Sequence, residues 1–181
     1  MSTAVEQWVE QQAALTKPDR TYWVQGTEDE MRRLIEIGMT QEKTGPHQTF
    51  RELNQEVFAN SYLHRSHPND VARTEQLTFV CTPQRDEAGP NNNWMDPAEA
   101  KSKVSALFDG CMRGRTLYVI PYMMGHPQSP YAKPCIQITD SIYVVVSMYI
   151  MTRAGKQTLD RIGTSANFVK GLHSVDGPWV P

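Results

Sequence analysis

Residues 21–38 read TYWVQGTEDEMRRLIEIG, and this stretch indicates the fold class more directly than any other. Residues 21–24 are mostly β-branched or aromatic, which predicts a short strand. Thr27 followed by Glu30 is a capping box, so a helix is expected to begin there. Gly38 is placed to end that helix. The apolar face of the helix is supplied by Met31, Leu34 and Ile35. A strand, a turn and a helix in succession are typical of α/β proteins.

Apolar residues at helical spacing predict three further helices, at residues 4–16, 97–108 and 156–162. The first begins at a capping box formed by Thr3 and Glu6. The second has Asp96 as its cap and Pro97 as its first residue, which is a strong start signal.

Strands are predicted where β-branched and aromatic residues gather, at residues 78–81, 116–122, 136–139 and 168–172. Residues 144–151 fit two interpretations: the β-branched content favours a strand, whereas Asp140 or Ser141 as a cap favours a helix. Residues 52–58 are also either helix or strand. Long loops are expected at 82–95 and 123–134. The predicted fold class is α/β, with a mixed sheet flanked by helices.

Length and charge limit the function classes. The chain has 181 residues, which predicts a single domain over residues 1–181. The 18 basic and 20 acidic residues give a net charge of −2, so no positive field would gather nucleic acid or an anionic membrane. No apolar stretch approaches the length that crosses a bilayer. We therefore expect neither a nucleic-acid nor a membrane partner.

Three cysteines, Cys81, Cys111 and Cys135, are an odd number without a CxxC pair, which argues against a secreted disulfide framework. The first ten residues carry Glu6 and Glu10 and do not resemble a secretory leader. We expect a cytoplasmic protein whose cysteines are core residues.

Two common site patterns are absent from the sequence. The Gly155-Lys156 pair is no phosphate-binding loop, because Ile150 and Gln157 stand where that motif needs glycine and a hydroxyl residue. His64 and His67 are three positions apart, but no second pair of metal ligands matches them, so a solvated surface role is expected. No metal site and no cofactor site is predicted.

Arg73 precedes the predicted strand at residues 78–81. A guanidinium there can hold a carboxylate or a phosphate through two parallel N–H bonds. Composition alone favours a surface or ion-paired arginine, and the same holds for Arg113, Arg115 and Arg153. The loop GPNNNW at 89–94 is expected to be an Asx-rich turn capped by a packing tryptophan.

Several longer segments, taken in order, carry a family resemblance: DVARTE at 70–75, GPNNNWM at 89–95, GCMRGRTLYVIP at 110–121, ITDS at 138–141, IMTR at 150–153 and LHSV at 172–175. From about Val5 to Pro178 the chain resembles the N-terminal domain of GTP-dependent phosphoenolpyruvate carboxykinase. The 110–121 and 150–153 segments are the most specific of the set.

The resemblance implies a function for a longer polypeptide. Family members convert oxaloacetate and GTP into phosphoenolpyruvate, GDP and carbon dioxide with Mn²⁺ or Mg²⁺. Their nucleotide loop, metal ligands and guanine pocket correspond to a C-terminal lobe beyond this sequence. This chain alone is therefore expected to bind neither GTP nor metal, to hold no catalytic residue and to be inactive. Arg73 matches the position that holds oxaloacetate or phosphoenolpyruvate, and it is the one predicted site residue.

The sequence departs from the family at Tyr149, where members usually have arginine, and at His126 and Pro127. The loss of a positive charge at Tyr149 argues against an ion pair there. Such departures suggest a divergent member or a chain freed from catalytic constraint. Beside the N-terminal part of an enzyme, two alternatives therefore stay open: a catalytically dead short relative that binds small dicarboxylates or a protein, and a structural half that associates with a separately encoded C-terminal lobe.

Overall fold

The computed structural model describes residues 2–40, 49–65 and 74–175. Arg73 and His67 lie outside these ranges. The helices are α1 (Ala4–Thr16), α2 (Glu28–Thr40), α3 (Pro97–Phe108), α4 (Ile142–Met151) and α5 (Lys156–Ile162), with short 3-10 helices η1 (Glu75–Leu77) and η2 (Arg85–Ala88). The strands are β1 (Arg20–Trp23), β2 (Arg51–Glu52), β3 (Tyr62–Leu63), β4 (Phe79–Val80), β5 (Asn93–Trp94), β6 (Thr116–Met124), β7 (Lys133–Thr139), β8 (Arg153–Ala154) and β9 (Val169–Leu172).

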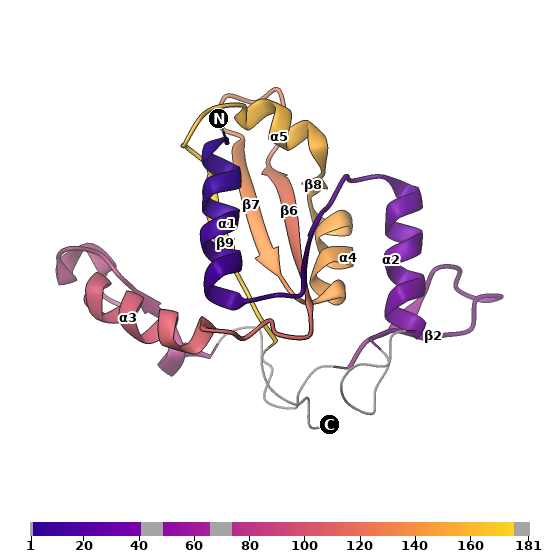
Figure 1. The fold of residues 1–181 in the computed structure, drawn as a ribbon, viewed down its shortest axis with the longest axis horizontal. Helices are drawn as coiled ribbons and strands as arrows, with labels where there is room; N and C mark the ends of the chain where they lie inside the picture. Colours follow the sequence, from indigo (N-terminus) through magenta and orange to yellow (C-terminus); the bar gives the residue numbers. More distant parts are fainter. Residues whose placement is uncertain (1, 41–48, 66–73, 176–181) are drawn as a thin grey trace.

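A mixed sheet forms the centre of the protein, in the order β1-β6-β7-β9, with β8 paired to the end of β6 (Figure 1). β1 runs parallel to β6, and β9 runs parallel to β7. β6 and β7 are antiparallel. The predicted mixed α/β sheet is therefore confirmed.

Helices cover both faces of this sheet, and each face has its own hydrophobic core. Alternate residues of β6 point to opposite faces, so Leu117 belongs to one core and Tyr118 to the other. Val5 and Val9 of α1 and Ile162 of α5 pack on the first face. The second face is covered by α2 and α4. Burial of apolar side chains on both faces fixes the register of the strands.

Residues 144–151, for which strand and helix were both predicted, lie in the helix α4. The Ser141 side chain accepts a hydrogen bond from the Val144 N–H at 3.4 Å and caps the helix. Ile142, Val145 and Val146 then form one buried face at helical spacing. The cap and the packing outweigh the strand preference of the β-branched residues.

The prediction that Gly38 ends its helix is wrong, because α2 continues to Thr40. A Cβ atom at Gly38 would lie 2.5 Å from the ring of Phe50, and the Phe50 N–H donates to the Gly38 carbonyl oxygen at 3.0 Å. Glycine is present here because another segment approaches the helix closely. The alternatives of one helix or one strand over residues 52–58 are also wrong, since only Glu52 of that range belongs to β2.

Residues 79–108 contribute an arm beside the sheet, drawn in magenta in Figure 1, which contains β4, β5 and α3. Asp96 caps α3 as predicted, accepting from the backbone N–H groups of Ala98 and Glu99. No residue of α3 is buried. None of the helices in the described ranges is both long and apolar enough to cross a membrane.

Candidate functional site

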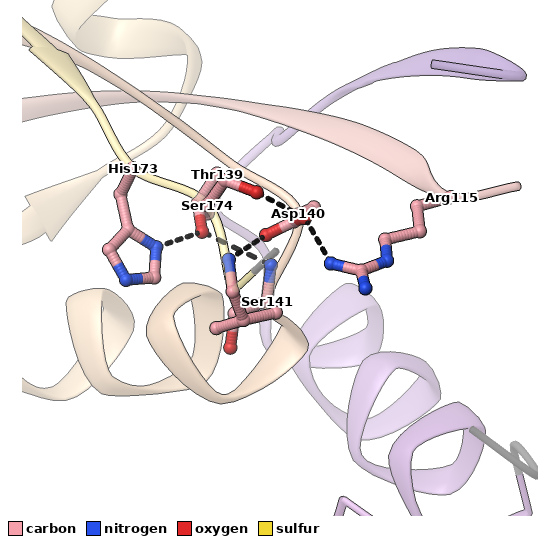
Figure 2. A network of polar contacts seen from close by, with 7 residues as sticks. Arg115, Thr139, Asp140, Ser141, His173 and Ser174 are labelled. Atoms are coloured by element: carbon pink, nitrogen blue, oxygen red, sulfur yellow. Dashed lines mark hydrogen bonds and ion pairs between the residues drawn. The ribbon is translucent and has the colours of Figure 1, made fainter. Parts of the chain in front are cut away.

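Three of the segments that carry the family resemblance meet at one edge of the sheet (Figure 2). Arg115 directly precedes β6, Asp140 directly follows β7, and His173 directly follows β9. β7 is antiparallel to β6 and parallel to β9. The beginning of β6 and the ends of β7 and β9 therefore share an edge, and Figure 2 shows the three side chains gathered there.

Asp140 is the centre of this network. Its Oδ2 atom accepts hydrogen bonds from Nη1 of Arg115 and from the Ser174 hydroxyl, each at 2.8 Å. Its Oδ1 atom accepts from the Val175 N–H at 2.9 Å. The side chain of Asp140 is fully buried, at 0% exposure, and that of Arg115 is 23% exposed. A buried carboxylate needs such partners, because an unpaired charge is costly away from water.

A second set of bonds joins the neighbouring residues. Nδ1 of His173 and Oγ1 of Thr139 are 2.9 Å apart, and the Ser141 N–H donates to the same oxygen at 3.1 Å. The His173 N–H also donates to the Ile138 carbonyl oxygen at 2.9 Å. The end of β7, the first turn of α4 and the end of β9 are consequently held as one unit.

This arrangement positions the backbone. Both oxygens of Asp140 accept hydrogen bonds from neighbouring groups, and the charge of Asp140 is balanced by Arg115. Asp140 therefore fixes residues 174 and 175 against the sheet. No group of three or more His, Cys, Asp or Glu side chains that could hold a metal ion occurs within the described ranges. Asp140 does not offer a ligand set for a divalent cation, because Arg115 balances its charge and both of its oxygens accept hydrogen bonds from the protein.

Glu30 forms a second buried polar cluster, on the face covered by α2 and α4. It is only 1% exposed. Its carboxylate accepts from the Tyr22 hydroxyl at 2.7 Å, from the Gly26 N–H at 2.9 Å and from the Gln25 N–H at 2.8 Å. The Tyr149 hydroxyl donates to the same carboxylate. Among the described residues no ion pair includes Glu30, so neutral donors alone solvate its charge.

These donors control the ionisation of Glu30. Burial raises its pKa, but the hydrogen bonds from Tyr149, Tyr22 and the two backbone N–H groups outweigh burial, and the pKa of Glu30 lies below its ordinary value. Burial and the adjacent Glu30 raise the pKa of Tyr22 to about 12, and the same two causes raise the pKa of Tyr149. The cluster is therefore one carboxylate with two neutral tyrosines at neutral pH.

The turn that Glu30 holds lies against the segment that follows α4. A Cβ atom at Gly26 would lie 2.2 Å from the Ala154 carbonyl oxygen, and one at Gly155 would lie 2.3 Å from the Gln25 carbonyl oxygen. Both glycines have positive φ angles, +84° and +123°. Only residues without a Cβ atom fit this crossing.

The arginines singled out in the sequence have different positions. Arg115 is ion-paired, and Arg113 and Arg153 are exposed, which confirms the surface or ion-paired prediction for these three. Arg73, the one predicted substrate-binding residue, lies outside the described residues, and its role stays a prediction.

Two other predictions have definite outcomes. The prediction of an Asx-rich turn at GPNNNW is correct only for the first part of the segment, where the Asn92 amide donates to the Ala88 carbonyl oxygen. Asn93 and Trp94 instead form β5, which pairs with β4, and their side chains donate to the carbonyl oxygens of Glu75 and Thr82. The prediction of a solvated His64 is wrong, since its ring stacks on Tyr143 with centroids 3.9 Å apart.

The cysteines divide into two groups. Cys111 and Cys135 are buried as predicted, and burial raises the pKa of the Cys135 thiol. Cys81 is exposed, so the core prediction is wrong there. It lies directly after β4 in the arm.

The sequence did not reveal that Glu30 and Asp140 are buried. A capping box indicated Glu30, and a possible helix cap indicated Asp140, but both signals concern local structure. The partners that bury these carboxylates come from distant segments, Tyr149 for Glu30 and Arg115 and Ser174 for Asp140. No short-range pattern contains that information.

The chain is similar to one family of known proteins. Residues 7–179 match the family model described as phosphoenolpyruvate carboxykinase N-terminal domain. The chain is 50% identical over 168 residues to the phosphoenolpyruvate carboxykinase [GTP] of Anaeromyxobacter dehalogenans (strain 2CP-C), an alignment that covers 93% of this chain and 27% of the relative.

Two further relatives carry the same name. The Arthrobacter sp. (strain FB24) protein is 49% identical over 179 residues, which covers 96% of this chain and 28% of that protein. The Chlamydia caviae protein is 46% identical over 177 residues, covering 98% and 28%. The chain thus spans about a quarter of the length of the curated relatives it matches.

Proposed function

Because the chain belongs to the phosphoenolpyruvate carboxykinase N-terminal domain family, we propose that it is the N-terminal, substrate-side part of a GTP-dependent phosphoenolpyruvate carboxykinase. The complete enzyme would convert oxaloacetate and GTP into phosphoenolpyruvate, GDP and carbon dioxide, a step of gluconeogenesis. The observation that carries this proposal is 50% identity over 168 residues to a relative of that name. Residues 1–181 would form one domain of that enzyme.

Arg73 is the residue we propose to bind the substrate. Oxaloacetate carries two carboxylates, and phosphoenolpyruvate carries a carboxylate and a phosphate. A guanidinium can bind such groups through two parallel N–H bonds, which orients them and offsets part of their mutual repulsion. Lysine would supply the charge without the two-point orientation.

GTP and the Mn²⁺ or Mg²⁺ ion would be bound by the remainder of such an enzyme. The described part of this chain has no cluster of metal-binding side chains, and the sequence has no phosphate-binding loop at Gly155-Lys156. We therefore expect no turnover by this chain alone.

The three cysteines form no disulfide, which supports a reducing, cytoplasmic location.

The remainder of the polypeptide would also be the partner of this domain. Large apolar side chains are exposed on the arm and just before it: Leu77 and Leu107 are each 75% exposed, and Phe79 and Val104 are also exposed. Exposed apolar groups of this size mark interaction surfaces. We propose that they pack against the C-terminal part of the enzyme, which makes up almost three quarters of the length of the relatives.

The alternative of a catalytically dead relative rested in part on the replacement of arginine by Tyr149. In this protein Tyr149 itself donates to Glu30, so the cluster is complete without the arginine. This replacement therefore does not point to loss of function.

A chimera tests the proposal. This chain would replace the matching N-terminal part of the Anaeromyxobacter dehalogenans relative, and kcat/KM for oxaloacetate would be measured. Arg73→Ala is expected to lower kcat/KM by about 10- to 100-fold, the range for loss of charged hydrogen bonds. Arg73→Lys should lose less, because it keeps the charge.

Arg32→Ala is the matched control, since Arg32 is an exposed arginine on α2. It should leave kcat/KM within twofold of the unsubstituted chimera. An Arg73→Ala chimera that was equally active would contradict a substrate-binding role.

A further inference from the structure

A pocket of about 290 Å³ lies between the β6–β7 connection, the end of α5 and the start of β9. Two cationic residues line it, Lys133 at the first position of β7 and Arg161 in the last turn of α5. Figure 1 shows α5 beside the β6–β7 connection, at one end of the sheet. Lys133 and Asp140 lie at opposite ends of β7, so this pocket is about 20 Å from the Arg115–Asp140 network.

The charge of the pocket has one sign. None of the residues that line it is aspartate or glutamate. Within the described residues neither Lys133 nor Arg161 forms an ion pair, and Asp160, next to Arg161 in the sequence, pairs with Lys156. A third cation, Lys170, lies over the ring of Phe168, which is itself a lining residue, at 5.2 Å from the centroid. Lys133 and Arg161 line the pocket without a carboxylate beside them, so their charges favour an anion there.

Hydrogen-bond donors accompany these charges. One N–H of Arg161 reaches the Ser129 carbonyl oxygen at a long 3.4 Å, which leaves most of the five guanidinium donors available. The Ser165 oxygen accepts from the Asn167 N–H at 3.0 Å, so its own O–H can donate outward. Within the described part of the chain, the Asn167 amide and the Lys133 ammonium have no hydrogen-bond partner. Ammonium, guanidinium, hydroxyl and amide donors together suit an oxyanion.

We propose that this pocket binds a small organic oxyanion through a phosphate or carboxylate group held by Lys133 and Arg161. Phe168 and Ile162 supply an apolar wall for the body of the ligand. A volume of 290 Å³ is at the lower limit of ligand pockets, which selects a small molecule. This proposal does not depend on the proposed function, because it uses none of the residues assigned to the carboxykinase reaction.

Titration of the full 181-residue chain, followed by the backbone and arginine side-chain resonances in NMR, tests the proposal. Inorganic phosphate should cause saturable shifts at Ser165–Phe168 and at the Arg161 side chain. Sodium chloride at equal ionic strength should not. Acetate distinguishes the two sources: saturation by acetate as well indicates a carboxylate ligand, and saturation by phosphate alone indicates a phosphate ester.

Arg161→Gln and Lys133→Gln should each weaken binding about two- to fivefold, and the double variant should lose more than either. Lys101→Gln removes the same charge from α3 and should leave the affinity unchanged. Arg73→Ala should also keep the shifts at Ser165, which separates this test from that of the proposed function. Shifts that chloride reproduces, or that persist unchanged in a well-folded double variant, would overturn the proposal.

Discussion

Arg115 and Asp140, 25 positions apart in sequence, form the least exposed ion pair among the described residues, with 2.8 Å between Nη1 and Oδ2. The pair connects the residue before β6 with the residue after β7, and Asp140 also accepts from Ser174 and Val175 beyond β9. Three strand ends thus depend on one carboxylate. We infer that the Arg115–Asp140 ion pair holds these three strand ends together.

Arg115→Ala should lower the free energy of unfolding by about 3 kcal/mol, because it leaves the buried Asp140 charge without its cation. This value is at the lower end of the range for buried pairs, since Arg115 is partly exposed. Urea denaturation followed by circular dichroism measures it. Arg113→Ala, which removes an exposed arginine two positions away, should change stability by no more than about 0.5 kcal/mol. Equal effects of the two substitutions would contradict a structural role for the pair.

Tyr149→Phe should destabilise the fold by about 1–3 kcal/mol, because the buried Glu30 carboxylate loses a donor while the ring is kept. Tyr131→Phe is the control, since Tyr131 is 86% exposed. Tyr149→Arg should be tolerated better than Tyr149→Leu, because a guanidinium can also donate to Glu30. A Tyr149→Phe variant as stable as Tyr131→Phe would show that the hydroxyl contributes nothing.

The depressed pKa of Glu30 makes a stability contribution depend on pH. A carboxyl group with a lower pKa in the folded state stabilises the fold above its unfolded pKa, about 4.3, and this contribution disappears as pH falls through the folded value. The difference in unfolding free energy between the unsubstituted protein and Glu30→Gln should therefore be largest near pH 7. Below about pH 4 it should shrink.

Urea denaturation at several pH values measures this difference. Glu28→Gln, at an exposed position of the same helix, should show no comparable pH dependence. A Glu30→Gln difference that stayed constant down to pH 3 would contradict ionisation of Glu30 in the folded protein.

Local signals in the sequence predicted most of the fold correctly, because the residues that carry them act on their own backbone. Thr3 and Glu6 form the predicted capping box, and Asp96 with Pro97 begins α3 as predicted. The mixed sheet also follows the predicted strands. The errors have a different origin. Gly38 resembled a helix end, but its role is to accommodate Phe50, which approaches from outside the helix.

The candidate sites also divide into features set by local sequence and features set by distant segments. The ion pair of Arg115 agrees with a prediction made from a single segment. The predicted turn at residues 89–94 covers only part of that segment, because Asn93 and Trp94 pair with β4 as the strand β5. The burial of Glu30 depends on Tyr149, 119 positions away, and no sequence pattern joins the two. The role of Arg73 was predicted from the family resemblance, because an arginine before a strand does not by itself identify a ligand.

Gly155→Ala should destabilise the protein by more than about 2 kcal/mol, because the new methyl group would overlap the Gln25 carbonyl in addition to straining a backbone with φ +123°. Gly114→Ala is the matched control, with φ +74° but nothing within 4 Å of the new Cβ atom. It should cost about 1 kcal/mol from backbone strain alone. Thermal denaturation compares the two, and equal losses would contradict the close crossing of Gly26 and Gly155.

The exposed apolar side chains of the arm and of the residues just before it should cause the chain to self-associate at high concentration. Light scattering is expected to show a mean mass that rises with concentration. Leu77→Lys combined with Leu107→Lys should suppress this rise, because both residues are 75% exposed and tolerate a charge. Lysine at the exposed Val57, outside the arm, should suppress it less. A chain that stayed monomeric throughout would show that this surface needs no partner.

GTP-dependent formation of phosphoenolpyruvate from oxaloacetate by the chimera with the Anaeromyxobacter dehalogenans relative is the most direct measurement of the proposed function. If this chain is the substrate-side part of a carboxykinase, the chimera should reach a kcat/KM within about tenfold of the parent enzyme, while this chain alone shows no turnover. A folded chimera that binds GDP normally but forms no phosphoenolpyruvate would contradict the proposal.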